Sequence, residues 1–258
     1  MVLFAGLDGG GTKTQIWIGG IQGPALAELT VGPSSLSRAS QASVQAVLAD
    51  GLRVGLRRCG GESAAVRAIC AGFASAGTNG GVYLALLREL APQAQVRVMP
   101  DAELAWYAAT GGEDGIVVIS GTGSIVWGHY NGRTLRVGGD GPGRDPGSGD
   151  AIGRAAVAAG LLPTPPTQDF AALVPELAAR PSETTVFWQQ AGRDLAAQVR
   201  QCALGLAWPR PRVYFLGGVL ENAPAVLRSL QCELGEPLLP VQQRPAHAAL
   251  VLARELVT

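Results

Sequence analysis

The sequence predicts an α/β protein built from two similar halves. A strand, a glycine-rich turn and a second strand open the chain in "LFAGLDGGGTKTQIWIGG", residues 3–20. The same order returns in "GIVVISGTGSIVWGHY", residues 115–130, near the middle of the chain. After each hairpin, apolar residues recur at the three- and four-residue spacing of helices. Two hairpins that each open about half of the chain indicate an internal duplication.

Composition and charge restrict the class of protein. The chain has 258 residues, of which 47% are hydrophobic, and this is enough for one large domain or two ordinary ones. Its 20 basic and 20 acidic residues balance, which argues against binding to nucleic acid. No apolar run reaches the about 20 residues of a membrane helix, and no export signal opens the sequence. We therefore expect a cytoplasmic protein with no membrane or nucleic-acid partner.

The four cysteines do not form a recognisable metal or redox motif. None stands in a C-x-x-C pair and none has a histidine at metal-ligand spacing. We therefore interpret them as buried structural thiols. They are Cys59, Cys70, Cys202 and Cys232.

The first glycine turn has the chemistry of a phosphate site. Without Cβ atoms, the backbone N–H groups of Gly10, Gly11 and Thr12 can approach an anion closely. Asp8 would repel a phosphate, so its position predicts a divalent cation, or the water around one, between the two. Lys13 either leans toward phosphate or faces solvent. The alternative is a tight turn with glycines at positive φ, although a two-residue turn does not need three glycines.

The second glycine turn offers donors without a carboxylate. Its residues Gly121, Thr122, Gly123 and Ser124 supply backbone N–H groups and two hydroxyls. Neither turn is a Walker A loop or a Rossmann fingerprint, because both of those motifs open a helix and these turns are followed by strands. Two such turns facing one another could hold the phosphates of one nucleotide from both sides.

Asp101 lies between a strand and a helix. Helices are expected over 37–60 and 79–92, and the stretch from Val66 reads as strand and loop. A short strand over 96–99 and a helix over 102–110 then place Asp101 at a strand end and a helix start. The residue can be an N-cap, a general base at the carboxyl edge of a sheet, or both.

A glycine-dense stretch follows the second hairpin. Residues 136–150 contain too much glycine for a regular element, and a loop of this length in a compact domain is usually functional. Its polar side chains could bind a polyhydroxylated ligand, and they are Asp140, Asp145, Ser148 and Asp150. A helix is expected from Ala151, helices interrupted by prolines follow, a strand ends at Gly217 and Gly218, and a terminal helix spans 246–257.

These pieces together resemble the actin/sugar-kinase/Hsp70 ATPase superfamily, and within it the BadF/BadG/BcrA/BcrD ATPase family. "GLDGGGTKT" and "ISGTGS" match the two phosphate motifs, "FLGGVLEN" matches the adenosine motif, and "PDAELA" matches the segment with the catalytic aspartate of the sugar kinases. "GPSS" and "RDPGSG" stand where relatives bind sugar. The resemblance implies two ribonuclease H-like domains, over 1–108 and 109–258, with a nucleotide cleft between them.

The resemblance also implies a role for each matching residue. Asp101 is the expected catalytic base, and Asp8 is expected to bind Mg²⁺ through water. The expected ATP-binding residues are Gly10, Gly11, Thr12, Lys13, Gly121, Thr122, Gly123, Gly217 and Gly218. The expected substrate-binding residues are Ser34, Ser35, Asp101, Ser124, Gly139, Asp140, Gly141 and Asp145. ATP and Mg²⁺ are the implied cofactors, and because dimers are common in the family a homodimer stays open.

The leading hypothesis is ATP-dependent phosphorylation of N-acetylglucosamine or glucosamine at its 6-hydroxyl. Three departures leave the acceptor open, and another cell-wall sugar is an alternative: Ser35 replaces an asparagine, Asp140 a tryptophan and Pro146 a glutamate of the family pattern. Two other functions are weighed against it. One is an ATPase of the dehydratase-activator type, which holds an iron–sulphur cluster through cysteines. The other is a sensor that binds sugar or nucleotide without turnover.

Overall fold

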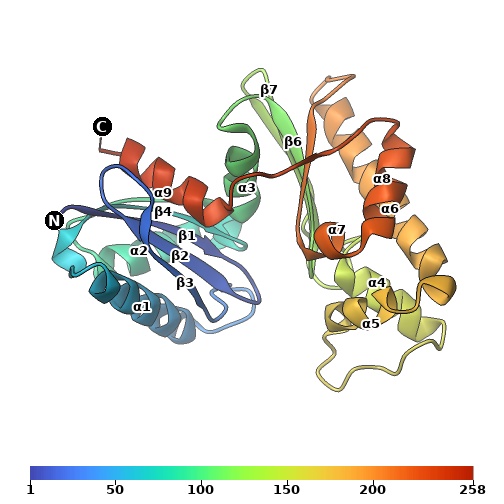
Figure 1. Ribbon diagram of the computed structural model, residues 1–258, viewed down its shortest axis with the longest axis horizontal. Helices are drawn as coiled ribbons and strands as arrows, with labels where there is room; N and C mark the ends of the chain where they lie inside the picture. The colour runs from blue at the N-terminus through green and yellow to red at the C-terminus, as the bar shows by residue number, and fades with distance from the viewer. Residues whose placement is uncertain (258) are drawn as a thin grey trace. The chain divides into compact units, whose positions relative to one another are not determined.

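The computed structural model describes residues 1–257, without the side chains of residues 181 and 182, and its chain divides into two compact units (Figure 1). The first unit comprises residues 1–108 and resumes at Gln242, and the second runs from Ala109 to Val241. Each unit contains one five-stranded sheet with helices packed against it. The predicted α/β class with two similar halves is confirmed.

The first sheet has the strand order β3-β2-β1-β4-β5. Its strands are β1 (Leu3–Gly9), β2 (Thr14–Gly19), β3 (Ala25–Val31), β4 (Val66–Phe73) and β5 (Gln95–Pro100). The first three are antiparallel, whereas β4 runs parallel to β1, and β5 parallel to β4. The carboxyl ends of β1, β4 and β5 therefore meet at one edge of the sheet, where ligands collect in α/β folds.

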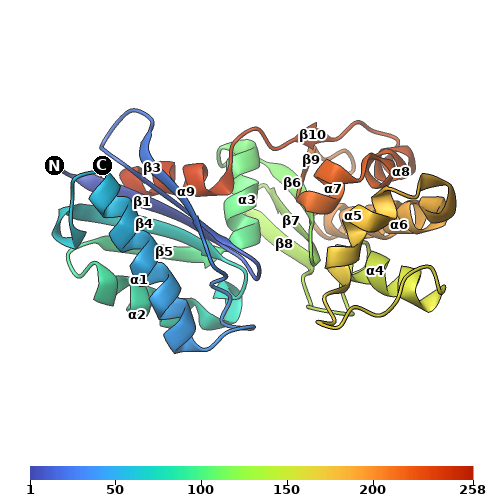
Figure 2. The ribbon, with the colours of Figure 1, turned by 60° about the horizontal axis from the view of Figure 1, so that its bottom comes forward.

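Four helices cover the first sheet (Figure 2). They are α1 (Gln41–Arg58), α2 (Ala76–Leu90), α3 (Asp101–Thr110) and α9 (Pro245–Glu255). One face of the sheet forms a core with α1 and α2, in which Leu7 of β1, Leu48 of α1 and Leu87 of α2 are completely buried. The helix α1 begins after Ser40, whose side chain accepts a hydrogen bond from Ser43 N, so it starts later than the sequence suggested.

The terminal helix α9 belongs to the first unit, which corrects the boundary predicted for the second domain. A Cβ at Gly6 of β1 would lie 2.1 Å from the backbone nitrogen of Leu250, so this glycine lets helix and strand backbones touch. Arg254 adds hydrogen bonds to the carbonyls of Gly20 (2.9 Å) and Gly23 (3.0 Å). Since these partners are more than 200 positions away in sequence, local pattern gave no indication of this contact.

The second sheet repeats the topology of the first, with the order β10-β9-β6-β7-β8. Its strands are β6 (Gly115–Ser120), β7 (Ser124–Tyr130), β8 (Arg133–Gly138), β9 (Val213–Leu216) and β10 (Leu239–Pro240). Again three antiparallel strands are joined by two parallel ones. The shared order confirms the duplication that the two hairpins indicated.

Five helices belong to the second unit. They are α4 (Gly149–Ala158), α5 (Val174–Ala178), α6 (Pro181–Gly205), α7 (Gly218–Asn222) and α8 (Pro224–Leu234). Short 3₁₀ helices occur at Ser63–Ala65 and Phe170–Leu173. Within the described part of the chain, no helix is both long and apolar enough to span a membrane.

Candidate functional site

The first glycine turn connects β1 and β2. The two strands pair antiparallel as far as Gly9 and Thr14, and Gly10 N donates to Lys13 O at 2.9 Å across the turn. A Cβ at Gly9 would lie 2.3 Å from Phe73 and from Ser34 Oγ, so packing requires glycine there. At Gly10 the nearest atom would be 3.5 Å away. Neither Gly10 nor Gly11 has a positive φ, so turn conformation does not explain them. Close approach of a ligand therefore stays the prediction for Gly10, whereas at Gly11 a Cβ would also lie 3.1 Å from the side chain of Arg38.

Two carboxylates meet at the carboxyl edge of the first sheet. Asp8 of β1 is in register with Gly72 of β4, which is in register with Met99 of β5. Asp101 follows β5 as the first residue of α3. Burial, and to a smaller extent the Asp101 carboxylate, raise the pKa of Asp8 to about 7, while Lys13 opposes both. Part of the Asp8 side chain still reaches solvent. Asp8 and Asp101 therefore lie near the same edge of the first sheet.

Asp101 occupies a helix start, where a negative charge is favourable. Its Oδ1 accepts a hydrogen bond from the adjacent Ala102 N at 2.8 Å, and the side chain is half-buried. An N-cap side chain would accept from a residue two or three positions further along the helix. The position at the helix start and at the sheet edge suits an N-cap, a base, or both.

The carboxylate pair fits a magnesium ion that is held mainly by a nucleotide. In residues 1–257 no group of three or more His, Cys, Asp or Glu side chains is arranged to hold a metal ion. Mg²⁺, however, is usually bound by one or two carboxylates, several waters and the phosphates of a substrate. Burial and the like charge of Asp101 raise the pKa of Asp8, and a divalent cation would stabilise both carboxylates in their charged form.

The predicted substrate residues Ser34 and Ser35 lie beside the first glycine turn. Both are buried, with exposed fractions of 0% and 2%. Ser34 N donates to Gly10 O at 3.1 Å, and Ser34 Oγ lies 2.8 Å from the hydroxyl of Thr14. Ser35 Oγ lies 2.8 Å from Ser37 Oγ. The structure thus places the expected sugar segment directly beside the expected phosphate loop, within one unit.

Sequence reasoning missed two residues at this edge. Tyr83 of α2 is buried, and its hydroxyl contacts the backbone on both sides of Ser35. The side chain of Arg38 lies against Gly11, 3.1 Å from where a Cβ would stand. A buried tyrosine is expected to find a polar partner, but nothing in the sequence says which one.

The second glycine turn is tied to the start of α4. Gly121 N donates to Gly123 O at 2.9 Å, and Gly149 N donates to Gly121 O at 2.8 Å. Gly217 follows β9, the parallel neighbour of β6, and has a φ of 107°. A Cβ at Gly217 would lie 2.4 Å from Ser120 O. The adenosine motif and this turn therefore meet at one edge of the second sheet.

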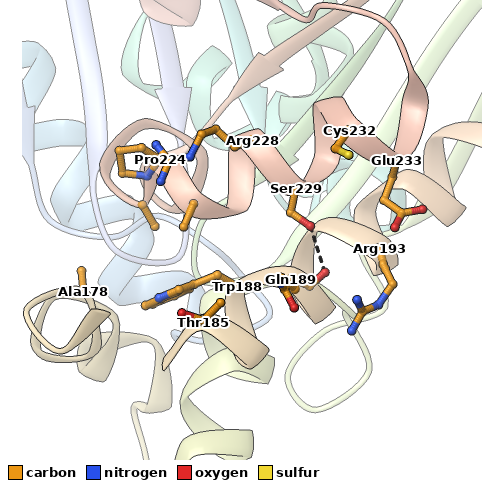
Figure 3. A pocket seen from close by; sticks show the side chains of 12 residues that line it. Ala178, Thr185, Trp188, Gln189, Arg193, Pro224, Arg228, Ser229, Cys232 and Glu233 are labelled. Carbon is orange, nitrogen blue, oxygen red and sulfur yellow. Dashed lines mark hydrogen bonds between the residues drawn. The ribbon is translucent and has the colours of Figure 1, made fainter. Parts of the chain in front are cut away.

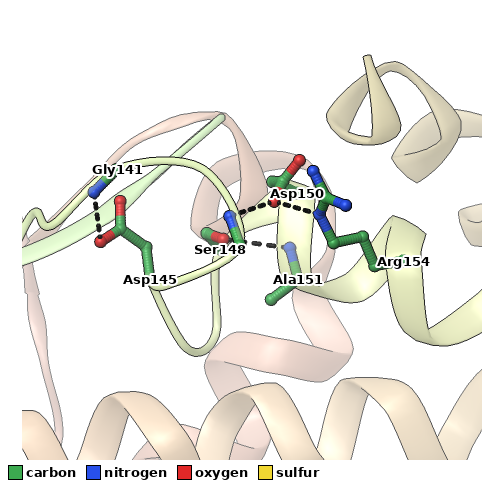
Figure 4. Close-up of polar contacts among 7 residues, drawn as sticks. Gly141, Asp145, Ser148, Asp150, Ala151 and Arg154 are labelled. Carbon is green, nitrogen blue, oxygen red and sulfur yellow. Dashed lines mark hydrogen bonds and ion pairs between the residues drawn. The ribbon is translucent and has the colours of Figure 1, made fainter. Parts of the chain in front are cut away.

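The glycine-dense loop is held by two carboxylates (Figure 4). Oδ1 of Asp145 accepts hydrogen bonds from the backbone nitrogens of Asp140 (2.6 Å) and Gly141 (3.1 Å). Oδ2 of Asp150 accepts from Gly143 N and from Arg154 Nε, both at 2.8 Å. Burial raises the pKa of Asp145, while these N–H donors lower it. These two carboxylates serve the loop itself, whereas Asp140 is exposed.

Ser124, another expected substrate residue, also has an internal partner. It is 2% exposed, and its hydroxyl donates to the carbonyl of Pro146 at 2.7 Å. Gln198 of α6 donates to the same carbonyl at 2.8 Å. The hydrogen bond from Ser124 to Pro146 joins the start of β7 to the glycine-dense loop. Ser124 is therefore connected to the loop that contains Gly139 and Gly141.

A separate cavity of about 670 Å³ lies between α6 and α8 of the second unit (Figure 3). Trp188 and Gln189 of α6 and Arg228 and Ser229 of α8 line it, and Ser229 Oγ donates to Gln189 O at 3.1 Å. Ala223, directly after α7, also lines this cavity. None of the expected nucleotide or sugar residues lines it. The cavity is therefore distinct from the residues that the motifs identify.

Comparison with known proteins gives one consistent result. Residues 5–158 match the BadF/BadG/BcrA/BcrD ATPase family. Over 160 residues the chain is 36% identical to an N-acetylmuramic acid/N-acetylglucosamine kinase of Clostridium acetobutylicum, and the match covers 60% of this chain and 52% of that protein. The chain thus spans about half the length of that relative.

Two solved structures share the fold. A protein of Chromobacterium violaceum assigned as an N-acetylglucosamine kinase superposes with a TM-score of 0.81 at 25% identity, over 98% of this chain and 99% of that one. A protein of Porphyromonas gingivalis with the same assignment gives a TM-score of 0.78 at 20% identity, over the whole of both chains. At this second level of identity the likeness concerns the fold alone.

Proposed function

Because this chain belongs to the BadF/BadG/BcrA/BcrD ATPase family, we propose that it is a kinase that transfers the γ-phosphate of ATP to the 6-hydroxyl of an amino sugar. The acceptor is N-acetylglucosamine or glucosamine. One observation carries the proposal: a glycine turn with room for a ligand, the carboxylates Asp8 and Asp101, and the buried segment Ser34–Ser35 all lie in the first unit near one sheet edge.

Nucleotide binding follows from the two glycine turns. The N–H groups of Gly10, Gly11 and Thr12 donate to phosphate oxygens, with Lys13 adding positive charge. The turn of Gly121, Thr122 and Gly123 serves the phosphates too, and Gly217 and Gly218 lie against the adenosine. The absence of Cβ atoms at Gly10 and Gly121, which have open space around them, supports this assignment.

Asp8 orders the water ligands of Mg²⁺ in this proposal. The ion supplies positive charge that neutralises the phosphate oxygens during transfer. The like-charge interaction of Asp8 with Asp101 supports the assignment, because it favours a cation between phosphate and protein.

Asp101 is the proposed general base. Its carboxylate accepts the proton of the 6-hydroxyl as that oxygen attacks the γ-phosphorus in line, and the remaining catalysis is positioning and charge stabilisation. Ser34 and Ser35 provide the sugar contacts nearest to it. Gly139, Asp140, Gly141, Ser124 and Asp145 are assigned to the sugar as well, with the carboxylate of Asp145 and the hydroxyl of Ser124 chiefly holding the loop.

No observation favours the dehydratase-activator alternative. An iron–sulphur cluster needs accessible thiolates, whereas Cys70 and Cys202 are buried and burial raises the pKa of each to about 12. The interpretation of all four cysteines as buried thiols is wrong for Cys59, which is half-buried, and for Cys232, which is the one exposed cysteine of the four. The sensor alternative is kept as an outcome of the test below.

Release of ADP, measured with a panel of sugars, tests the proposal. We expect N-acetylglucosamine or glucosamine to stimulate release, and phosphorus NMR of the product to show an ester at the 6-position. N-acetylglucosamine without its 6-hydroxyl is the matched control and should give no stimulation. Nucleotide binding without stimulation by any sugar would instead identify a sensor.

A further inference from the structure

Tyr83 has a hydroxyl with every hydrogen-bonding position filled. The side chain is completely buried in α2. Its hydroxyl donates to Ser34 O at 2.7 Å, accepts from Leu36 N at 2.9 Å, and lies 2.8 Å from Ser75 Oγ. A tyrosine hydroxyl offers one donor and two acceptor positions, so three partners satisfy it. A core tyrosine that only filled space would need one.

The first two partners are the neighbours of Ser35. Tyr83 bonds the carbonyl of the residue before Ser35 and the amide of the residue after it. On its other side, Ser34 is held by Gly10 O and by the hydroxyl of Thr14. Without the tyrosine hydroxyl, Ser34 would keep these bonds to the phosphate loop, but the backbone around Ser35 would lose both of its bonds to α2.

The third partner connects the same hydroxyl to the carboxyl edge of the sheet. Ser75 follows β4, and the preceding residue Ala74 donates from its backbone nitrogen to Gly9 O at 3.0 Å. Burial chiefly raises the pKa of Tyr83, and the charge of Asp101 adds to this rise. The hydroxyl therefore joins the serine segment to the residues that follow β4.

The ring of Tyr83 makes packing contacts that do not involve its hydroxyl. It stacks on Phe73 with the ring centres 4.0 Å apart and the planes 8° from parallel. Phe73 in turn packs against Gly9, where a Cβ would lie 2.3 Å from its ring. Removing the hydroxyl while keeping the ring thus removes the hydrogen bonds on both sides of Ser35. The ring packing beneath the phosphate turn stays unchanged.

We propose that Tyr83 is a positioning residue that fixes the backbone of Ser34–Leu36 so that Ser35 meets the sugar acceptor. This inference rests on the proposed function, because it assigns Ser35 to the sugar. It predicts a separation of effects, in which loss of the hydroxyl weakens sugar binding and leaves ATP binding intact.

Steady-state kinetics of Tyr83→Phe test the inference. We expect the KM for N-acetylglucosamine to rise by about 10-fold, which is the loss expected when hydrogen bonds that hold a binding segment are removed. The KM for ATP should stay within about 2-fold, because Ser34 keeps its bonds to the phosphate turn. Tyr107→Phe is the matched control, since it removes a hydroxyl bonded to Glu255 in the same unit and should change neither constant.

Three results would overturn the inference. The KM for N-acetylglucosamine could stay unchanged, the KM values for both substrates could rise equally, or circular dichroism could show that the variant is unfolded at the assay temperature. In the last two cases the hydroxyl stabilises the unit as a whole.

Calorimetric titration with N-acetylglucosamine separates this inference from the proposed function. If the natural chain binds the sugar but does not phosphorylate it, the proposed activity fails, while a weaker dissociation constant in Tyr83→Phe still supports the positioning role. If the natural chain binds neither N-acetylglucosamine nor glucosamine in such titrations, both fail.

Discussion

The two glycine turns lie in sheets of the same strand order but differ in how nearby carboxylates are used. In the first unit, burial and then the like charge of Asp101 raise the pKa of Asp8 to about 7. In the second unit, Asp145 and Asp150 each accept hydrogen bonds from backbone N–H groups of the glycine-dense loop.

This difference indicates a division of labour within the duplicated fold. In the second unit these hydrogen bonds hold the loop, and burial still raises the pKa of Asp145. A carboxylate next to another one has a raised affinity for protons and cations, which suits chemistry. We therefore expect substitutions in the first unit to affect turnover and those in the second to affect the stability of a loop.

The largest expected effect is that of Asp101→Asn on turnover. The change keeps the shape of the side chain and removes its ability to accept a proton, so kcat should fall by about 10² to 10⁴. Binding of ATP, measured by calorimetry, should persist. A kcat close to that of the natural chain would remove Asp101 from the role of base and with it the contrast between the units.

Alanine substitutions at two glycines of the second unit separate an effect on stability from an effect on ligand binding. Gly217→Ala should lower the free energy of unfolding by about 3 kcal/mol, because its φ of 107° is unfavourable for alanine and its Cβ would lie 2.4 Å from Ser120 O. At Gly121 no atom lies within 4 Å of a Cβ, so Gly121→Ala should fold normally. Urea unfolding measures both.

If phosphate approaches the second turn closely, Gly121→Ala should nevertheless weaken ATP binding. Unchanged nucleotide affinity in that variant would show that this turn does not need an open backbone for its ligand.

A smaller effect distinguishes two acidic residues of the glycine-dense loop. Asp145→Ala leaves the part-buried hydrogen-bond donors Asp140 N and Gly141 N without their acceptor and should cost about 2 kcal/mol of stability in urea unfolding. Asp140→Ala is the matched control and should cost less than about 0.5 kcal/mol, because this side chain is exposed. Equal stabilities of the two variants would contradict the structural role of Asp145.

Much of the fold was accessible from local sequence pattern. Both hairpins, β4, α1, α2 and the position of Asp101 follow from glycine signals and apolar spacing, which short windows contain. The outer strands β3 and β8 were missed, because at least half of their residues are not buried and their pattern is weak. The helix α8 was missed as well.

Contacts between distant segments account for what sequence could not supply at the site. Tyr83 reads as one apolar position of an amphipathic helix, and its partners Ser34 and Leu36 are 49 and 47 residues away. Asp145 matches a motif for sugar binding, but only the closed loop reveals that backbone N–H groups occupy its Oδ1. Motifs thus predict which residues form the site, and long-range hydrogen bonds show which backbone groups Tyr83 and Asp145 hold.

The smallest expected effect is the pH dependence that Asp8 gives to stability. Its pKa rises from 3.8 to about 7 on folding, so between these values the folded chain binds more protons than the unfolded one. The contribution of Asp8 to stability is therefore most favourable below pH 4 and decreases as the pH rises through 7. Because part of the side chain reaches solvent, we expect a change of only about 1 kcal/mol.

Asp8→Asn isolates this contribution. Relative to the natural chain, the variant should gain about 1 kcal/mol of unfolding free energy between pH 4.5 and pH 8 in urea titrations without Mg²⁺. Asp50→Asn, at an exposed carboxylate of α1, controls for the loss of one negative charge. Adding Mg²⁺ with ATP should reduce the difference, since a cation stabilises the ionised carboxylate. A variant that follows the natural chain at both pH values would mean that folding does not raise the pKa of Asp8, and the contrast between the two turns would disappear.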